Sequence, residues 1–146
     1  MVGTMDELTG GCMCGAIRYR IATASVMVEI CHCGSCRRAS GAPLMAWAAY
    51  PGEGFALTSG KPVAYASSPG VVRTFCGKCG TSLTLKDERF GEIYVALASF
   101  DAPERVVPEF HIWRSERLPW LETTDRWPRY LRFKFQGELE ANGSLA

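Results

Sequence analysis

Seven cysteines stand in three tight clusters along this chain of 146 residues. The clusters are Cys12 with Cys14, then Cys31, Cys33 and Cys36, and last Cys76 with Cys79. Cysteines that serve only as small buried apolar residues would be scattered singly. An odd number cannot all form disulfides within one chain, and structural disulfides are rare in a reducing compartment. The clusters therefore predict metal sites.

Length and composition predict one globular domain. Apolar residues make up 47% and charged residues 21% of the chain, which is ordinary for a globular protein. We expect a single zinc-binding domain over residues 1–146, with a core at about 9–130 and a flexible tail at about 136–146. The formal charge of +1 gives no general attraction to nucleic acid or to an anionic membrane. Residues 1–9 lack the apolar run of a secretory signal, and no stretch could span a bilayer, so a cytoplasmic protein is expected.

Strand signals dominate the chain and predict a mainly β, antiparallel fold. Runs rich in branched and aromatic residues, or with alternating apolar and charged residues, lie at 17–21, 44–50, 63–66, 71–75, 82–85, 93–97 and 110–113. Glycine and proline punctuate the intervals between several of them. The helix expected at 35–40 is short, begins within the middle cysteine cluster, and would be stopped by Gly41 and Pro43.

The last cluster is a Cys-x-x-Cys turn, and a glycine follows each of its cysteines, Cys76 and Cys79. Glycine supplies the positive φ of a tight turn that aims two thiolates at one ion. Cys12 and Cys14 offer a second pair, and two such pairs make a closed, tetrahedral zinc site that holds distant strands together. A redox-active pair would be the alternative, but it requires a helix after the motif, and residues 81–85 favour a strand.

The middle cluster places three thiols within six residues, at Cys31, Cys33 and Cys36. Three thiolates leave one tetrahedral position for water or substrate, which is the arrangement of catalytic zinc. A second partition of the cysteines is open at this point. It assigns the closed site to Cys12, Cys14, Cys31 and Cys33 and joins Cys36 to Cys76 and Cys79.

Two histidines and two arginines could take part in the chemistry of the middle cluster. The ring of His32, between two of the cysteines, would have to fold back sharply to become a ligand. For His111, in a strand-like run, we expect a packed or surface role. Arg37 and Arg38 follow the last cysteine of the cluster. They either bind an anionic ligand beside a negatively charged metal centre or are solvated helix residues.

Three segments of the sequence resemble the glutathione-dependent formaldehyde-activating enzyme family, which includes centromere protein V. These segments are GGCMCGAIRY at 10–19, CHCGSCRR at 31–38 and FCGKCGT at 75–81. The likeness extends to SFD at 99–101, HIW at 111–113 and PWL at 119–121, so it covers roughly residues 9–130. The order and spacing of all seven cysteines make the resemblance specific.

The resemblance implies a β-tent fold with two zinc ions. It assigns a structural zinc to Cys12, Cys14, Cys76 and Cys79, and a catalytic zinc to Cys31, Cys33 and Cys36. It further implies a carbon–sulfur lyase activity of the S-(hydroxymethyl)glutathione synthase type. The expected partners are a small thiol such as glutathione and a small aldehyde such as formaldehyde. Asp101 is either a general base near that site or a turn former.

Two other classes of function are weighed against the enzyme. A zinc-stabilised binding or carrier module would use zinc only to hold its fold, without catalysis. A nucleic-acid-associated protein is suggested by the interleaved basic and aromatic residues at 126–134, which can grip a backbone and stack on bases. The near-neutral charge favours a different account of that segment, as a final strand or irregular stretch that covers the core.

Overall fold

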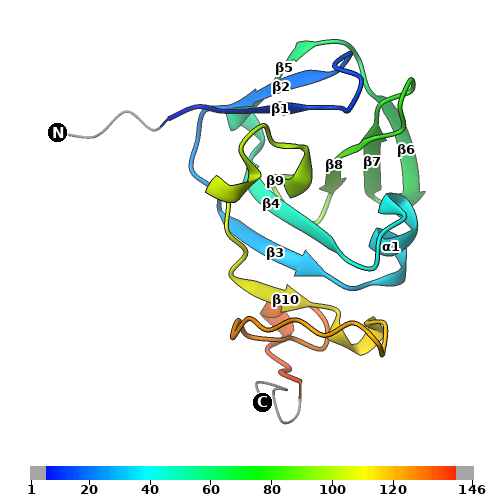
Figure 1. Cartoon of the computed structure of the whole chain (residues 1–146), viewed down its shortest axis with the longest axis vertical. Helices are drawn as coiled ribbons and strands as arrows, with labels where there is room; N and C mark the ends of the chain where they lie inside the picture. Colours follow the sequence, from blue (N-terminus) through cyan, green and yellow to red (C-terminus); the bar gives the residue numbers. More distant parts are fainter. Residues whose placement is uncertain (1–5, 141–146) are drawn as a thin grey trace, which may run out of the picture. The chain divides into compact units, whose positions relative to one another are not determined.

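The computed structural model describes residues 6–140, and its regular structure is mainly β (Figure 1). The strands of the described residues are β1 (Leu8–Gly11), β2 (Arg18–Ile21), β3 (Met27–Cys31), β4 (Met45–Pro51), β5 (Phe55–Ser59), β6 (Val63–Ser68), β7 (Val71–Phe75), β8 (Ser82–Asp87), β9 (Glu92–Ala96) and β10 (Phe110–Ile112). The α-helix is α1 (Gly34–Ser40), and 3₁₀ turns lie at Gly52–Gly54, Leu97–Ser99, Pro103–Arg105, Arg114–Glu116 and Lys134–Gln136. The predicted mainly β class is confirmed.

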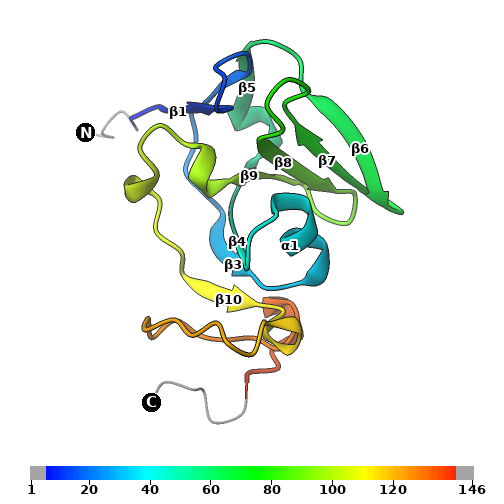
Figure 2. The same ribbon diagram turned by 45° about the vertical axis from the view of Figure 1, so that its right-hand side comes forward.

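The chain divides into two compact units, each described by itself below. The first unit comprises Met1–Met27 and Ala48–Val107. Within it, β1, β2 and β5 form an antiparallel sheet with β2 in the middle. Strands β9, β8, β7 and β6 follow one another in space in that order, each antiparallel to the next (Figure 2).

Tyr19 on β2 organises the core of the first unit. Its ring stacks on Phe55 of β5 at a centroid distance of 5.3 Å and meets Phe100 edge-on at 5.8 Å. Its hydroxyl forms a 2.7 Å hydrogen bond with the Ser99 hydroxyl, so the polar end of this buried side chain is satisfied. The alternating pattern at 17–21 therefore has the physical cause that was expected, with Tyr19 and Ile21 each 1% exposed.

Gly10 on β1 packs directly against this core. A Cβ at Gly10 would contact the Tyr19 hydroxyl and would lie 2.5 Å from the backbone oxygen of Ser99, which cannot easily move. We expect Gly10→Ala to cost about 1–3 kcal/mol by overpacking, which lowers the melting temperature by roughly 2–10 °C. Gly91→Ala is the matched control, because no atom lies within 4 Å of its added Cβ. Equal melting temperatures for the two variants would contradict this packing.

The second unit comprises Val28–Trp47 and Pro108–Ala146. Its strand β10 pairs in parallel with β3, so that His111 stands opposite Ile30 and Ile112 opposite Cys31. The other side of β10 is bonded to the later chain. His111 donates its N–H to the Pro128 oxygen and accepts from the Tyr130 N–H, at 2.8 and 2.9 Å. The end of the second unit therefore runs beside the strand pair that leads into the middle cysteine cluster.

Helix α1 begins inside that cluster and is fixed at both ends. The Cys33 sulfur accepts the Cys36 N–H at 3.3 Å, so a ligand candidate is also the helix N-cap. Gly41 ends the helix at a φ of 67° and donates its N–H to the Arg37 oxygen. The predicted helix at 35–40 is confirmed to within one residue.

Part of the predicted flexible tail is bonded to the second unit. Tyr130 and Leu139 form an isolated antiparallel bridge, and Glu140 pairs with Arg114 and Arg117 at 3.1 and 3.2 Å. Residues 141–146 of that tail lie outside the described residues. Within the described chain, no helix has the length and apolar character needed to cross a membrane.

Candidate metal centres

Two hairpin turns of the first unit carry the first and last cysteine pairs. The turn between β1 and β2 closes with a 3.1 Å bond from the Cys12 N–H to the Ile17 oxygen. The turn between β7 and β8 closes with a 3.0 Å bond from the Cys76 N–H to the Thr81 oxygen. Each turn contains a glycine at positive φ, 80° at Gly15 and 79° at Gly80. Glycine is needed at these positions because other residues strain there.

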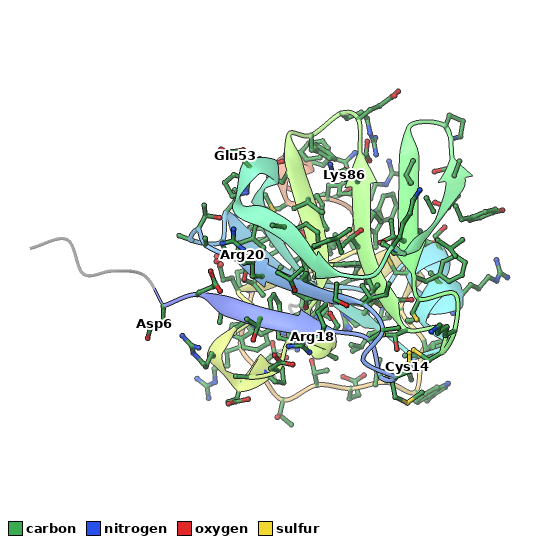
Figure 3. All side chains as sticks on the ribbon, turned by 90° about the horizontal axis from the view of Figure 1, so that it is seen from above. Asp6, Cys14, Arg18, Arg20, Glu53 and Lys86 are labelled. Atoms are coloured by element: carbon green, nitrogen blue, oxygen red, sulfur yellow. The ribbon has the colours of Figure 1, made fainter. Side chains whose placement is uncertain are left out.

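The four cysteines of these turns form one cluster. All four sulfur atoms, from Cys12, Cys14, Cys76 and Cys79, lie within 4.8 Å of one another, and Figure 3 shows Cys14 on the turn after β1. Two of the sulfur distances are 3.6 Å, from Cys12 to Cys14, and 3.8 Å, from Cys14 to Cys76. Tetrahedral zinc with Zn–S bonds of about 2.3 Å places its sulfurs about 3.8 Å apart. The donor set and its spacing therefore fit one zinc ion.

Hydrogen bonds toward the sulfurs of this four-cysteine cluster favour thiolates. The Ile17 N–H donates to the Cys12 sulfur at 3.2 Å, and the Lys78 N–H donates to Cys76 at 3.4 Å. Hydrogen bonding from Thr81 lowers the pKa of Cys79 to about 5. At Cys14 the Ala16 N–H favours the thiolate, but the neighbouring sulfurs outweigh it and raise the pKa to about 11. Crowded thiols of this kind ionise together only when a cation balances their charge.

The middle cluster lies in the second unit. The sulfurs of Cys31, Cys33 and Cys36 also lie within 4.8 Å of one another. Cys31 ends β3, Cys33 caps α1, and Cys36 lies in the first turn of that helix. The structure thus groups the seven cysteines as four and three, which is the first of the two partitions that the spacing left open.

Burial and polar neighbours shape the middle cluster, which we call the triad. Hydrogen bonding with Cys33 and Cys36, together with burial, raises the pKa of Cys31 well above its ordinary value. Buried Trp47 donates its indole N–H to the Cys36 sulfur at 3.4 Å, a bond that favours a thiolate. The three cysteine sulfurs are soft metal ligands, and they accept hydrogen bonds from one backbone N–H and one indole N–H. Such a ligand set fits a thiophilic ion such as zinc.

Arg37 and Arg38, near the triad, differ in their contacts with the rest of the protein. Arg37 donates to the backbone oxygens of His32 and Glu116 at 3.2 and 3.3 Å. Arg38 is exposed. Of the two arginines predicted to bind an anion, Arg37 therefore ties the triad loop to the 3₁₀ turn at Arg114–Glu116, whereas Arg38 faces solvent.

Comparisons with known proteins bear on the family and the fold of this chain. The family model described as glutathione-dependent formaldehyde-activating enzyme matches residues 7–116. The chain belongs to this family. An uncharacterized lyase of Schizosaccharomyces pombe is 36% identical over 81 residues, which cover 54% of this chain and 57% of that protein. A crystal structure of a Rhodobacter sphaeroides protein matches with a TM-score of 0.54 at 20% identity, over 64% of this chain and 87% of that one. The second likeness concerns the fold alone.

Sequence reasoning missed a chain of hydrogen-bonded side chains next to the triad, formed by two buried histidines and the half-buried Asp125. His32 Nε2 lies 2.9 Å from His111 Nδ1, and His111 Nε2 lies 3.0 Å from each carboxylate oxygen of Asp125. Both histidines are 0% exposed. Burial, followed by the charge of Arg114, lowers the pKa of His32 to about 3. His111 thus has a buried, hydrogen-bonded role, which falls within the packed role expected for it.

Asp101 and Arg129, each considered for another role, are held by neighbouring groups. Asp101 accepts from Arg18, at 2.9 Å for one oxygen, and from the Thr9 hydroxyl at 2.6 Å. These bonds lower the pKa of Asp101 to about 2, so it is a poor general base.

Arg129, in the segment considered for nucleic acid, is 4% exposed and donates to the backbone oxygens of Thr123 and Trp127.

The first unit also contains an apolar cleft of about 240 Å³. Tyr19, Phe55 and Leu83 are among the residues that line it, and Lys86, labelled in Figure 3, is the charged one. The residues that line it bring no cluster of titratable or metal-ligating groups together. We therefore place the candidate chemistry at the cysteine clusters.

Proposed function

We propose that this protein is a carbon–sulfur lyase of the glutathione-dependent formaldehyde-activating type. The observation that carries the proposal is the division of the cysteines into a cluster of four and a triad. Four thiolates fill the coordination shell of a zinc ion, whereas three leave a position for a ligand. The family match and the lyase name of the yeast relative support the same class of reaction.

The residues of the triad would hold a second zinc ion, and their neighbours would support them. Bound there, a zinc ion would supply a Lewis acid with one free position, where a small thiol loses its proton near neutral pH. The Cys36 N–H and the Trp47 indole N–H stabilise the thiolates of Cys33 and Cys36. Arg37 fixes the loop through the His32 oxygen, so the sulfurs keep their positions.

The proposed reaction joins glutathione, or a similar thiol, to formaldehyde. The sulfur forms a bond to the aldehyde carbon, and the carbonyl π bond breaks. Its electron pair goes to the oxygen, which takes up the proton that the thiol lost. The product is an S-hydroxymethyl thioether, and no oxidant or reductant is required. Exposed Arg38 is the residue near the triad that we propose to attract a carboxylate of the thiol substrate.

Stopped-flow measurement of adduct formation tests this proposal. Thiol and formaldehyde combine without a catalyst, so the uncatalysed rate is the reference. We expect zinc-loaded protein at catalytic concentration to raise that rate by at least about tenfold, and chelator-treated protein to leave it unchanged. An unchanged rate with zinc-loaded protein would remove the synthase activity and favour the carrier module.

A further inference from the structure

The hydrogen-bonded chain of Asp125, His111 and His32 has no role in the proposed reaction, yet it reaches the middle of the triad sequence. His32 lies between Cys31 and Cys33, and β3 ends at Cys31. Alternate residues of an extended segment point to opposite sides. His32 therefore reaches away from the two sulfurs, toward the segment that carries His111 and Asp125.

The contacts of the two rings, taken with the charge of Asp125, assign the nitrogen of each ring that carries hydrogen. Burial disfavours a charged Asp125, but hydrogen bonds from Thr123 and His111 outweigh it and lower its pKa, so the carboxylate accepts. His111 must then donate through Nε2. Burial, the largest influence, lowers the pKa of His111 and keeps its ring neutral, so its Nδ1 has a lone pair. His32 consequently donates through Nε2 across the 2.9 Å contact.

Each member of the chain is itself held in place. Asp125 accepts the Trp127 N–H at 3.1 Å and lies 3.4 Å from Arg129. The backbone of His111 bonds to Pro128 and Tyr130, and the His32 N–H donates to the Ile112 oxygen at 3.1 Å. The hydrogen bonds between these three side chains therefore join the segment around Asp125 and β10 to the backbone between Cys31 and Cys33.

We propose that Asp125, His111 and His32 are positioning residues that hold the triad loop in its metal-binding conformation. Asp125 orients His111, His111 accepts from His32, and His32 fixes the backbone between Cys31 and Cys33. This inference rests on the metal site of the proposed function. Mutation of a group that orients the ligands of a metal without binding the metal itself typically lowers metal affinity by about 10–100-fold.

Asp125→Asn is the informative variant because it keeps the shape and removes the charge. Trp127 and Arg129 hold the Oδ1 position, so the amide nitrogen replaces Oδ2 and brings a second donor toward His111 Nε2, which keeps only the uncharged Oδ1 as its acceptor. The contact loses one acceptor and its charge, which weakens the preference of His111 for the Nε2–H form. In the Nδ1–H form of both rings, His32 would have a buried, unpaired donor, since its Nδ1 has no hydrogen-bond partner now.

Two measurements test the proposal together. Long-range ¹H–¹⁵N NMR of the imidazole nitrogens is expected to show Nε2–H on both rings of the wild type and an increased share of Nδ1–H in Asp125→Asn. Chelator competition on zinc-loaded protein should show two phases of zinc release. The faster phase should be absent from Cys36→Ser, which would assign it to the triad. We expect Asp125→Asn to accelerate it by about tenfold or more without changing the slower phase.

The controls separate this role from general stability. Glu122→Gln removes an exposed carboxylate of the same segment and should change neither phase. Asp125→Glu restores the charge and should recover part of the slow release. Wild-type rings with Nδ1–H, or equal triad release in Asp125→Asn and Glu122→Gln, would overturn the inference. A wild-type protein that binds no metal at the triad would instead overturn the proposed function, and the NMR result would still be readable.

Discussion

Cys76→Ser is expected to unfold the first unit under conditions in which the wild type is folded. Cys76 is 1% exposed, and its sulfur lies 3.8 Å from that of Cys14 in the four-cysteine cluster. Structural zinc contributes about 10–16 kcal/mol in zinc-finger peptides, whereas a whole domain is stable by only about 5–15 kcal/mol. Loss of this ion therefore removes a free energy comparable to, or larger than, the whole stability of a domain.

Thermal unfolding followed by circular dichroism, with and without a chelator, measures this effect. Met13→Ser is the control because Met13 lies between two ligands in the same turn but is 83% exposed. We expect Met13→Ser to melt close to the wild type and Cys76→Ser to show no cooperative transition for the first unit. A transition at the wild-type temperature in Cys76→Ser would show that the cluster does not hold the fold through a metal.

Cys36→Ser is expected to abolish thiol-dependent activity while the protein stays folded. Cys36 belongs to the triad, and its sulfur accepts the Trp47 N–H. Serine is not ionised near neutral pH and is a poor ligand for zinc, so the triad would keep two thiolates. The four-cysteine cluster, made of other residues, remains intact. We expect adduct formation in stopped flow to fall to the uncatalysed rate.

Cobalt substitution gives a readout that does not depend on activity. The spectrum of cobalt-loaded wild type should change when glutathione is added, and the spectrum of Cys36→Ser should not. Ser35→Ala is the control, since Ser35 is exposed in the same helix and should leave both rate and spectrum as in the wild type. A thiol response preserved in Cys36→Ser would mean that the thiol binds elsewhere.

The strands that the sequence predicts well are those whose residues alternate or are rich in branched side chains. β7 is predicted with both of its ends, and β2, β4, β6, β8, β9 and β10 within a few residues. β1 was missed because it contains Gly10 and Gly11, which have low strand propensity, and its pairing with β2 decides its conformation. β3 was missed because Val28–Cys31 are all buried, so no alternation appears.

In the candidate site, too, local sequence patterns were predictable and contacts between distant residues were not. The cysteine clusters are visible because their spacing within each turn is set by the chemistry of the metal. The Asp125–His111–His32 chain has no such spacing, since its members are separated by 79 and 14 residues. Only the pairing of β10 with β3 and the return of the chain along β10 bring these side chains together.

Elemental analysis of the purified protein, run alongside native thiol titration, shows whether both cysteine clusters bind metal. We expect two zinc ions per chain and seven cysteines that react slowly with a thiol reagent until a chelator is added. One zinc ion with three fast-reacting thiols would contradict this expectation, because the triad would then bind no metal and could not carry the proposed reaction.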